Sequence, residues 1–201
     1  MRTRLLTGEG RIWPEITAAA KKASRADVAV AYFGKGGANR LPLKRGSRLV
    51  VDASEYCVKA RATHPGDLLK LHRKGVAIFS YPNLHAKVVV LPKRAFIGSA
   101  NNSEHSAKQL SEAVVETTDA DVVAAARFFV DSLCVEAPLG PDELKKLETL
   151  YRKSKSRRRG MTPVKPTRKP CWWLSSYSYG DWPEGFEKRA EEQQAKAEQG
   201  R

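Results

Sequence analysis

Six short, strongly apolar segments alternate with helix-like segments over the first two thirds of this 201-residue chain. Each is bounded by Gly, Pro or charged residues, and such runs indicate β-strands. Because the apolar residues are nearly continuous, both faces of these strands should be covered. The pattern predicts an α/β fold, a layered α/β/α sandwich with a mixed central sheet. The expected strands are residues 26–33, 47–53, 76–81, 85–91, 94–97 and 113–118, and the expected helices are residues 13–24, a stretch through Tyr56, 65–74 and 119–133.

The composition changes after Cys134, where the alternation of strands and helices stops. A segment rich in Pro and Gly follows, and then a short helical pattern over residues 142–151. We therefore expect one folded domain over residues 1–134. Residues 135–201 should form a linker, a short helix and a basic, aromatic C-terminal extension that ends in a polar helix over 184–201.

The chain carries 36 Lys and Arg against 22 Asp and Glu, a net charge of +14. Nine basic residues and no acidic residue lie between Arg152 and Lys169. This concentration of charge favours a polyanionic partner, and nucleic acid is the usual one. A solvated basic tail would have the same composition.

No run approaches the ~18 apolar residues that a membrane span needs, and we expect no membrane partner. The N-terminal segment breaks off at Gly8-Glu9-Gly10, before a signal-peptide core. The three cysteines are widely spaced and form no CxxC pair. These features favour a cytoplasmic protein without a disulfide framework or a zinc site.

The segment with the most chemistry begins at His85-Ala86-Lys87, and Gly98-Ser99-Ala100-Asn101 follows it after a short interval. In a strand, His85 and Lys87 point to the same face because the side-chain period is two. Gly98 should let the backbone approach a ligand closely. An imidazole, an ammonium, an amide and a hydroxyl together suit a phosphate oxyanion, and no carboxylate cluster that would hold a metal is present.

This stretch resembles the HxK…GSxN signature of the phospholipase D superfamily, and is most similar to its small single-motif bacterial endonuclease members. The resemblance makes residues 1–134 a phospholipase D-like catalytic domain. It implies that His85 is a nucleophile or general acid, that Lys87 and Asn101 stabilise charge and that Ser99 supports them. It also implies a phosphohistidine intermediate and no metal or other cofactor. A histidine with a pKa near neutrality suits both roles, and fixed cations suit the charge on pentavalent phosphorus.

Glu112 extends the resemblance, because the small endonuclease members carry a glutamate fourteen residues after the glycine of GSxN, as Glu112 follows Gly98. By this likeness it accepts a hydrogen bond from the second ring nitrogen of a histidine. The alternative interpretation is a solvated glutamate that precedes a strand and has no role in the site. The sequence departs from the family at Pro92, where an aspartate is usual, and in an interval before Gly98 that is one residue shorter.

The chain holds a single copy of the motif, whereas the family's mechanism uses two histidines. The other histidines indicate surface or capping roles. His64 precedes Pro65, His72 lies on an expected helix before Arg73-Lys74, and His105 has no lysine two residues later. The resemblance therefore implies a homodimer through the active-site face, and isologous pairs are the commonest oligomers.

Several residues outside the motif suit nucleic acid. Lys35 lies in a Gly-rich turn after the first expected strand, although the spacing is not that of a P-loop. Tryptophans beside cations can stack on unpaired bases, but the same residues can dock on the domain or on the other protomer. The candidate nucleic-acid-binding residues are Lys35, Arg157, Arg158, Arg159, Trp172 and Trp173.

The sequence thus predicts a metal-independent phosphodiesterase that hydrolyses nucleic acid, a DNA endonuclease, with DNA favoured over RNA. Two alternatives stay open. A nucleic-acid-binding module could keep the scaffold and lose turnover, as Pro92 suggests, and a phospholipase D could act on lipid.

Overall fold

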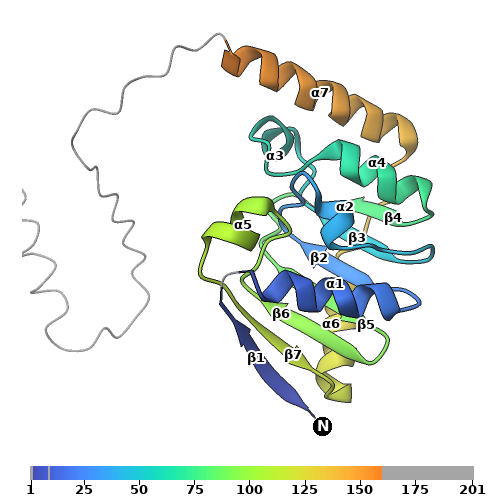
Figure 1. Ribbon diagram of the computed structural model, residues 1–201. Helices are drawn as coiled ribbons and strands as arrows, with labels where there is room; N and C mark the ends of the chain where they lie inside the picture. Colours follow the sequence, from blue (N-terminus) through green and yellow to red (C-terminus); the bar gives the residue numbers. More distant parts are fainter. Residues whose placement is uncertain (1, 9, 160–201) are drawn as a thin grey trace, which may run out of the picture. The chain divides into compact units, whose positions relative to one another are not determined.

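A computed structural model describes residues 2–8 and 10–159 of the chain. They form one seven-stranded mixed sheet, in the order β1-β7-β6-β5-β2-β3-β4, with helices packed on its faces (Figure 1). The strands are β1 (Thr3–Thr7), β2 (Asp27–Val30), β3 (Arg48–Val51), β4 (Ala77–Ser80), β5 (Lys87–Leu91), β6 (Arg94–Gly98) and β7 (Ala113–Thr117). The helices are α1 (Ile12–Lys22), α2 (Gly37–Arg40), α3 (Glu55–Lys59), α4 (Pro65–Arg73), α5 (Glu104–Gln109), α6 (Ala120–Ser132) and α7 (Pro141–Arg159).

Both faces of the central strands are covered, as the continuous apolar runs predicted. Neighbouring residues of a strand point to opposite faces, so Val28 and Val30 of β2 join the core under α1 and α4, whereas Ala29 packs in the core under α6. The strands β2, β3 and β4 are parallel, and β5, β6, β7 and β1 are antiparallel to their neighbours. The predicted α/β/α sandwich with a mixed sheet is confirmed.

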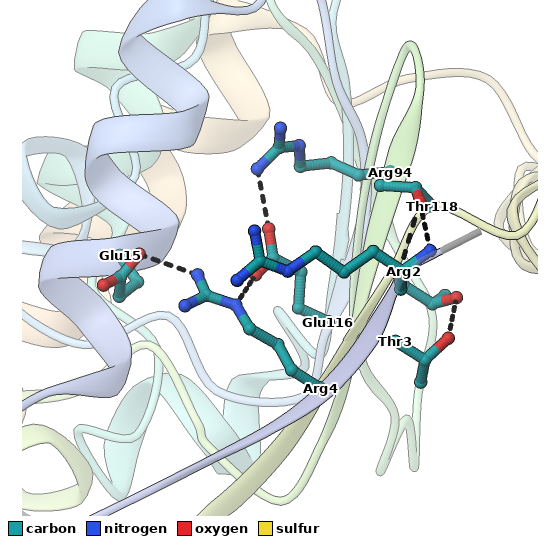
Figure 2. A network of polar contacts seen from close by, with 8 residues as sticks. Arg2, Thr3, Arg4, Glu15, Arg94, Glu116 and Thr118 are labelled. Atoms are coloured by element: carbon teal, nitrogen blue, oxygen red, sulfur yellow. Dashed lines mark hydrogen bonds and ion pairs between the residues drawn. The ribbon is translucent and has the colours of Figure 1, made fainter.

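Three elements were not predicted: β1, α2 and α5. Strand β1 pairs with β7 at the edge of the sheet, and a buried carboxylate secures it there. Glu116, which is 6% exposed, binds the guanidinium of Arg4 and accepts from Arg94 at 2.6 Å (Figure 2). Arg4 also bonds Glu15 of α1 at 3.0 Å. A buried charge is tolerated only when it is paired in this way, so the network fixes β1 to β7 and to α1.

The helix expected in the C-terminal extension belongs to the folded body. Helix α7 packs against α3 and α4, and Leu144 and Tyr151 on it are buried. The Tyr151 ring lies edge-on to His64, with centroids 4.8 Å apart, and Arg61 lies 3.8 Å from its centroid. Helix α7 thus packs with the elements of the expected domain, although it lies beyond the expected boundary at residue 134. The expected helix over residues 184–201 lies outside the described residues.

Candidate active site

The strand register brings the predicted site residues together at one end of the central strands, the edge of the sheet at which β2 and β6 end and β5 begins. Lys87 at the start of β5 pairs with Val30 at the end of β2, and Gly98 at the end of β6 pairs with Val114 of β7. Because β5 and β6 run antiparallel, the start of one strand lies beside the end of the other. His85 and Lys87 therefore meet the segment that begins at Ser99, although the Pro92–Lys93 turn separates them in sequence.

His85 precedes β5 and is exposed, and Lys87 is half-buried as the first residue of that strand. The Lys87 ammonium donates to the carbonyl oxygen of His85 at 2.8 Å. Burial lowers the pKa of Lys87, while the nearby negative charge of Glu112 opposes that shift. An accessible imidazole thus stands next to a cation that is partly withdrawn from water, a combination suited to an anionic substrate.

Glu112 lies between two serines. The Ser99 hydroxyl donates to one carboxylate oxygen, and the Ser106 hydroxyl donates to the other at 2.6 Å. Ser99 in turn accepts from the backbone N–H of Ala113 at 3.1 Å. Sequence reasoning placed Ser99 and Glu112 in the site but missed Ser106, which is buried on α5. The signal for α5 was the N-cap Ser103, which accepts from the backbone of Ser106.

The side-chain oxygen of Asn101 has no hydrogen-bond partner among the described residues. This Oδ1 atom is buried, and burying an amide without a partner is unfavourable unless a ligand or a water completes its bonds. Asn101 follows Ser99 by two residues at the same sheet edge. An unsatisfied amide oxygen at the same strand ends as the exposed His85 indicates a place for a polar ligand.

The Gly34–Gly37 loop, which carries Lys35, is fastened to the segment after β6. Gly34 donates its backbone N–H to the carbonyl oxygen of Asn102 at 2.9 Å. The buried side chain of Asn102 donates to Gly37 at 3.1 Å and accepts from Arg40 at 3.0 Å. Lys35 therefore lies along the site. Asn102 and Arg40 were missed from sequence, because only the three-dimensional pairing brings residues 34–40 to residue 102.

A buried carboxylate holds the same loop from its other side. Asp67 of α4 is 1% exposed, accepts from the backbone N–H of Gly36 at 2.6 Å and pairs with Lys70 at 2.9 Å. Gly36 has a φ of +80°, a conformation that favours glycine. Burial alone would raise the pKa of Asp67, but bonds from His64, Lys70 and Gly36 hold it well below its usual range.

Replacing Asp67 with asparagine should destabilise the protein, because the bonds from Gly36 and Lys70 lose their charged acceptor. We expect a loss of about 1–3 kcal/mol in the free energy of unfolding at neutral pH. A lowered pKa in the folded state stabilises the fold above the ordinary pKa of the group, near 4, and that contribution disappears as the pH falls toward the folded-state value. Urea unfolding should therefore show a gap between Asp67→Asn and wild type that narrows below about pH 4.

Asp142→Asn serves as the matched control, because Asp142 is exposed on α7 and pairs with the equally exposed Lys145. An exposed pair contributes little to stability, so this variant should unfold close to the wild type across the pH range. A gap for Asp67→Asn that stays constant down to the acid range would contradict the role assigned to the Asp67 charge.

The other predicted nucleic-acid contacts are not all placed by the structure. Arg157, Arg158 and Arg159 end α7, and their side chains lie outside the described residues, as do Trp172 and Trp173. Among the described residues, no three His, Cys, Asp or Glu side chains are grouped closely enough to hold a metal ion. In the same part of the chain, no helix is both long and apolar enough to cross a membrane.

Comparison with solved structures defines the class of fold: the chain has the fold of a phospholipase D family member. It is similar to Nuc from Salmonella typhimurium, a member of that family, with 16% identity over 66% of this chain and 94% of that one, and a TM-score of 0.52. NucT from Helicobacter pylori gives 13% identity, 68% and 98% coverage, and a TM-score of 0.51.

Phosphatidylserine synthase from Haemophilus influenzae Rd KW20 shares the fold over 77% of this chain but 43% of its own, with 11% identity and a TM-score of 0.51. No protein-family model and no curated protein matches the chain. At these identities the likeness establishes the fold, and the activity has to be argued from the site.

Proposed function

We propose that the protein is a phosphodiesterase that cleaves nucleic acid, a DNA endonuclease that needs no metal. The observation that carries the proposal is that the exposed His85, the half-buried Lys87 and Asn101, whose amide oxygen has no partner among the described residues, come from adjoining ends of β5 and β6. Phosphoryl transfer depends on positioning and on fixed charges around phosphorus, and these three groups supply a nucleophile, a cation and an amide.

Charge selects the substrate class. A net charge of +14 suits the phosphate backbone of nucleic acid, whose affinity for proteins is dominated by such contacts. Lys35, on the loop fastened to Asn102, adds a cation along the site. We propose that Arg157, Arg158, Arg159, Trp172 and Trp173 extend the contact, with DNA favoured over RNA.

In the proposed reaction, a ring nitrogen of His85 attacks phosphorus, and the phosphorus bond to the leaving oxygen breaks. A nitrogen–phosphorus bond forms, and the leaving oxygen takes its proton from His85 of the partner subunit. Water then attacks phosphorus and gives a proton to His85 of the partner subunit, while the nitrogen–phosphorus bond breaks and frees the first histidine. Lys87 and Asn101 stabilise the charge on the phosphate oxygens, while Ser99 and Ser106 orient Glu112.

The second histidine has to come from another subunit. His64 caps α4 and packs against Tyr151, and His72 lies in the last turn of α4. His105 is exposed on α5 and lacks the lysine that accompanies His85. Each carboxylate oxygen of Glu112 accepts one hydrogen bond from a serine of its own chain and keeps a second lone pair that can accept from a histidine ring nitrogen. We therefore propose a homodimer through the active-site face, in which Glu112 acts on the histidine of the partner subunit.

One departure from the family pattern raises a second candidate, a nucleic-acid-binding module without turnover. Pro92 stands where the family has aspartate, but it lies in the exposed turn between β5 and β6. That turn is at the far end of β5 from His85, so the substitution leaves the candidate active site untouched. The placement of Pro92 therefore favours the enzyme over the binding module.

The test is incubation of plasmid, single-stranded DNA and RNA with the purified protein in a metal chelator. We expect cleavage of DNA that the chelator does not reduce. Cleavage that depends on added divalent metal would overturn the metal-free mechanism, and salt-dependent binding without cleavage would favour the binding module. Hydrolysis of phosphatidylcholine vesicles with nucleic acid left intact would instead indicate a phospholipase.

A further inference from the structure

A second basic surface lies at the edge of the sheet opposite the candidate active site. The parallel strands β2, β3 and β4 are neighbours in the sheet, so all three begin at this edge. The segments that lead into them are hydrogen-bonded to one another in a row. Ala26 donates to the Ser47 hydroxyl at 3.0 Å, and Gly46 donates to the carbonyl oxygen of Gly75 at 3.1 Å. Helices α1 and α4 end on the same side, away from α5 (Figure 1).

These segments are rich in cations. We call this surface the distal basic edge, and it consists of Lys21, Lys22, Arg25, Lys44, Arg45, Arg73 and Lys74. All seven are exposed, and none of them forms an ion pair within the described part of the chain. Residues 21–26, 41–47 and 72–76 contain no acidic residue. The nearby Asp27 is buried and already pairs with Arg48 and Arg127.

Helix ends explain only part of this charge. Lys21, Lys22 and Arg73 lie in the last turns of α1 and α4, where cations interact favourably with the helix dipole. Arg25, Lys44 and Arg45 lie in connecting loops, and no helix ends at these positions. The Arg45 side chain lies against Gly75 and so bridges two of the three segments. Seven unpaired cations repel one another, and a polyanion would relieve that repulsion.

We propose that the distal basic edge binds the phosphate backbone of duplex nucleic acid, separately from the candidate active site. Three adjacent strands span about 10 Å at ~4.8 Å per strand. Duplex DNA places a phosphate about every 3.4 Å along each strand, so this width matches two or three phosphates. Strands of four or five residues separate the two edges by about 15 Å. The distal basic edge therefore contacts a different stretch of nucleic acid from the one at His85.

The inference shares its ligand class with the proposed function but does not depend on catalysis. The test compares two full-length proteins. One carries His85→Ala alone, so that the DNA stays intact, and the other carries His85→Ala together with Lys44→Gln and Arg45→Gln. Duplex DNA binding is measured over a range of salt concentrations. Loss of two phosphate contacts should weaken binding and reduce the slope of log K against log salt by about 2.

The matched control is Lys145→Gln with Lys146→Gln, which removes two exposed cations from the first half of α7, outside the basic block that begins at Arg152. Thermal unfolding checks that both double variants are folded. An equal loss for the control pair, or no loss for Lys44→Gln and Arg45→Gln, would overturn the inference. It would also be overturned if the pair lost binding to phosphatidylglycerol vesicles while duplex binding stayed unchanged.

Cleavage by the wild type is measured in parallel and decides the proposed function separately. If the wild type does not cleave DNA but Lys44→Gln with Arg45→Gln specifically weakens binding, the distal basic edge is supported and the nuclease proposal is wrong. If the wild type cleaves DNA and the two substitutions leave binding unchanged, the nuclease proposal is supported and the distal basic edge is wrong.

Discussion

His85→Ala should abolish DNA cleavage, with a loss of about 10⁴-fold or more in kcat/KM, because both chemical steps pass through this imidazole. Removing the nucleophile of an enzyme typically has an effect of this size, and what remains comes from binding and charge stabilisation. The Lys87 ammonium and the Asn101 amide stay in place, so the variant should still bind DNA. The measurement is plasmid nicking in chelator, with gel-shift binding on the same preparation.

His105→Ala is the control for this result. His105 lies close to the motif in sequence. It is exposed on α5, three residues after Asn102. In the proposed mechanism it has no chemical role, so its replacement should leave cleavage close to the wild-type rate. If His105→Ala lost as much activity as His85→Ala, the two histidines would belong to one chain, and the homodimeric site would be wrong.

Mixing the subunits tests whether the site is shared. Equal amounts of wild type and His85→Ala, unfolded and refolded together, should give about one quarter of wild-type homodimers by random pairing of two subunits. If each reaction needs both histidines, activity per total protein should fall to about one quarter of that of pure wild type. Independent sites would instead leave about one half.

The sequence was most informative where structure depends on local pattern. The strands from β2 to β7 and the helices α1, α4 and α6 follow apolar periodicity and the stops at Gly and Pro. Strand β1 was missed because its exposed Leu5 alternates with Arg4, whose charge is neutralised only by Glu116 and Glu15 far along the chain. Helix α5 is six residues long, too short for a clear apolar stripe.

The residues of the motif were predicted together because the family pattern spans two neighbouring strands and the turn that joins them. The His85–Lys87 segment and the Gly98–Asn101 segment flank one hairpin, so their proximity follows from the turn at Pro92. The supports of the site were not predicted. Asn102 and Asp67 act through the backbone of the Gly34–Gly37 loop, and that contact joins residues that no local pattern connects.

Gly98 shows the limit most clearly, because the sequence alone could not identify the neighbouring backbone that lies against this glycine. The sequence suggested that this glycine lets the backbone approach a ligand. In the structure the close approach is to β7: a Cβ atom at Gly98 would lie 2.2 Å from the carbonyl oxygen of Ala113 and 2.7 Å from the Cα of Val114. Both are backbone atoms and cannot rotate away.

Gly98→Ala should therefore push β6 and β7 apart next to Ser99 of the candidate active site. Overpacking of this kind costs about 3 kcal/mol or more when backbone has to move. We expect a large fall in the urea midpoint. We also expect reduced cleavage in the variant that remains folded, because Ser99 directly follows Gly98 and Glu112 directly precedes Ala113.

The control is Gly140→Ala, whose Cβ would meet only the flexible end of Glu143 at 3.5 Å. A Gly98→Ala variant that unfolds at the same urea concentration as Gly140→Ala would show that the two strands can separate freely, and the tight β6–β7 contact would then not hold the site in place.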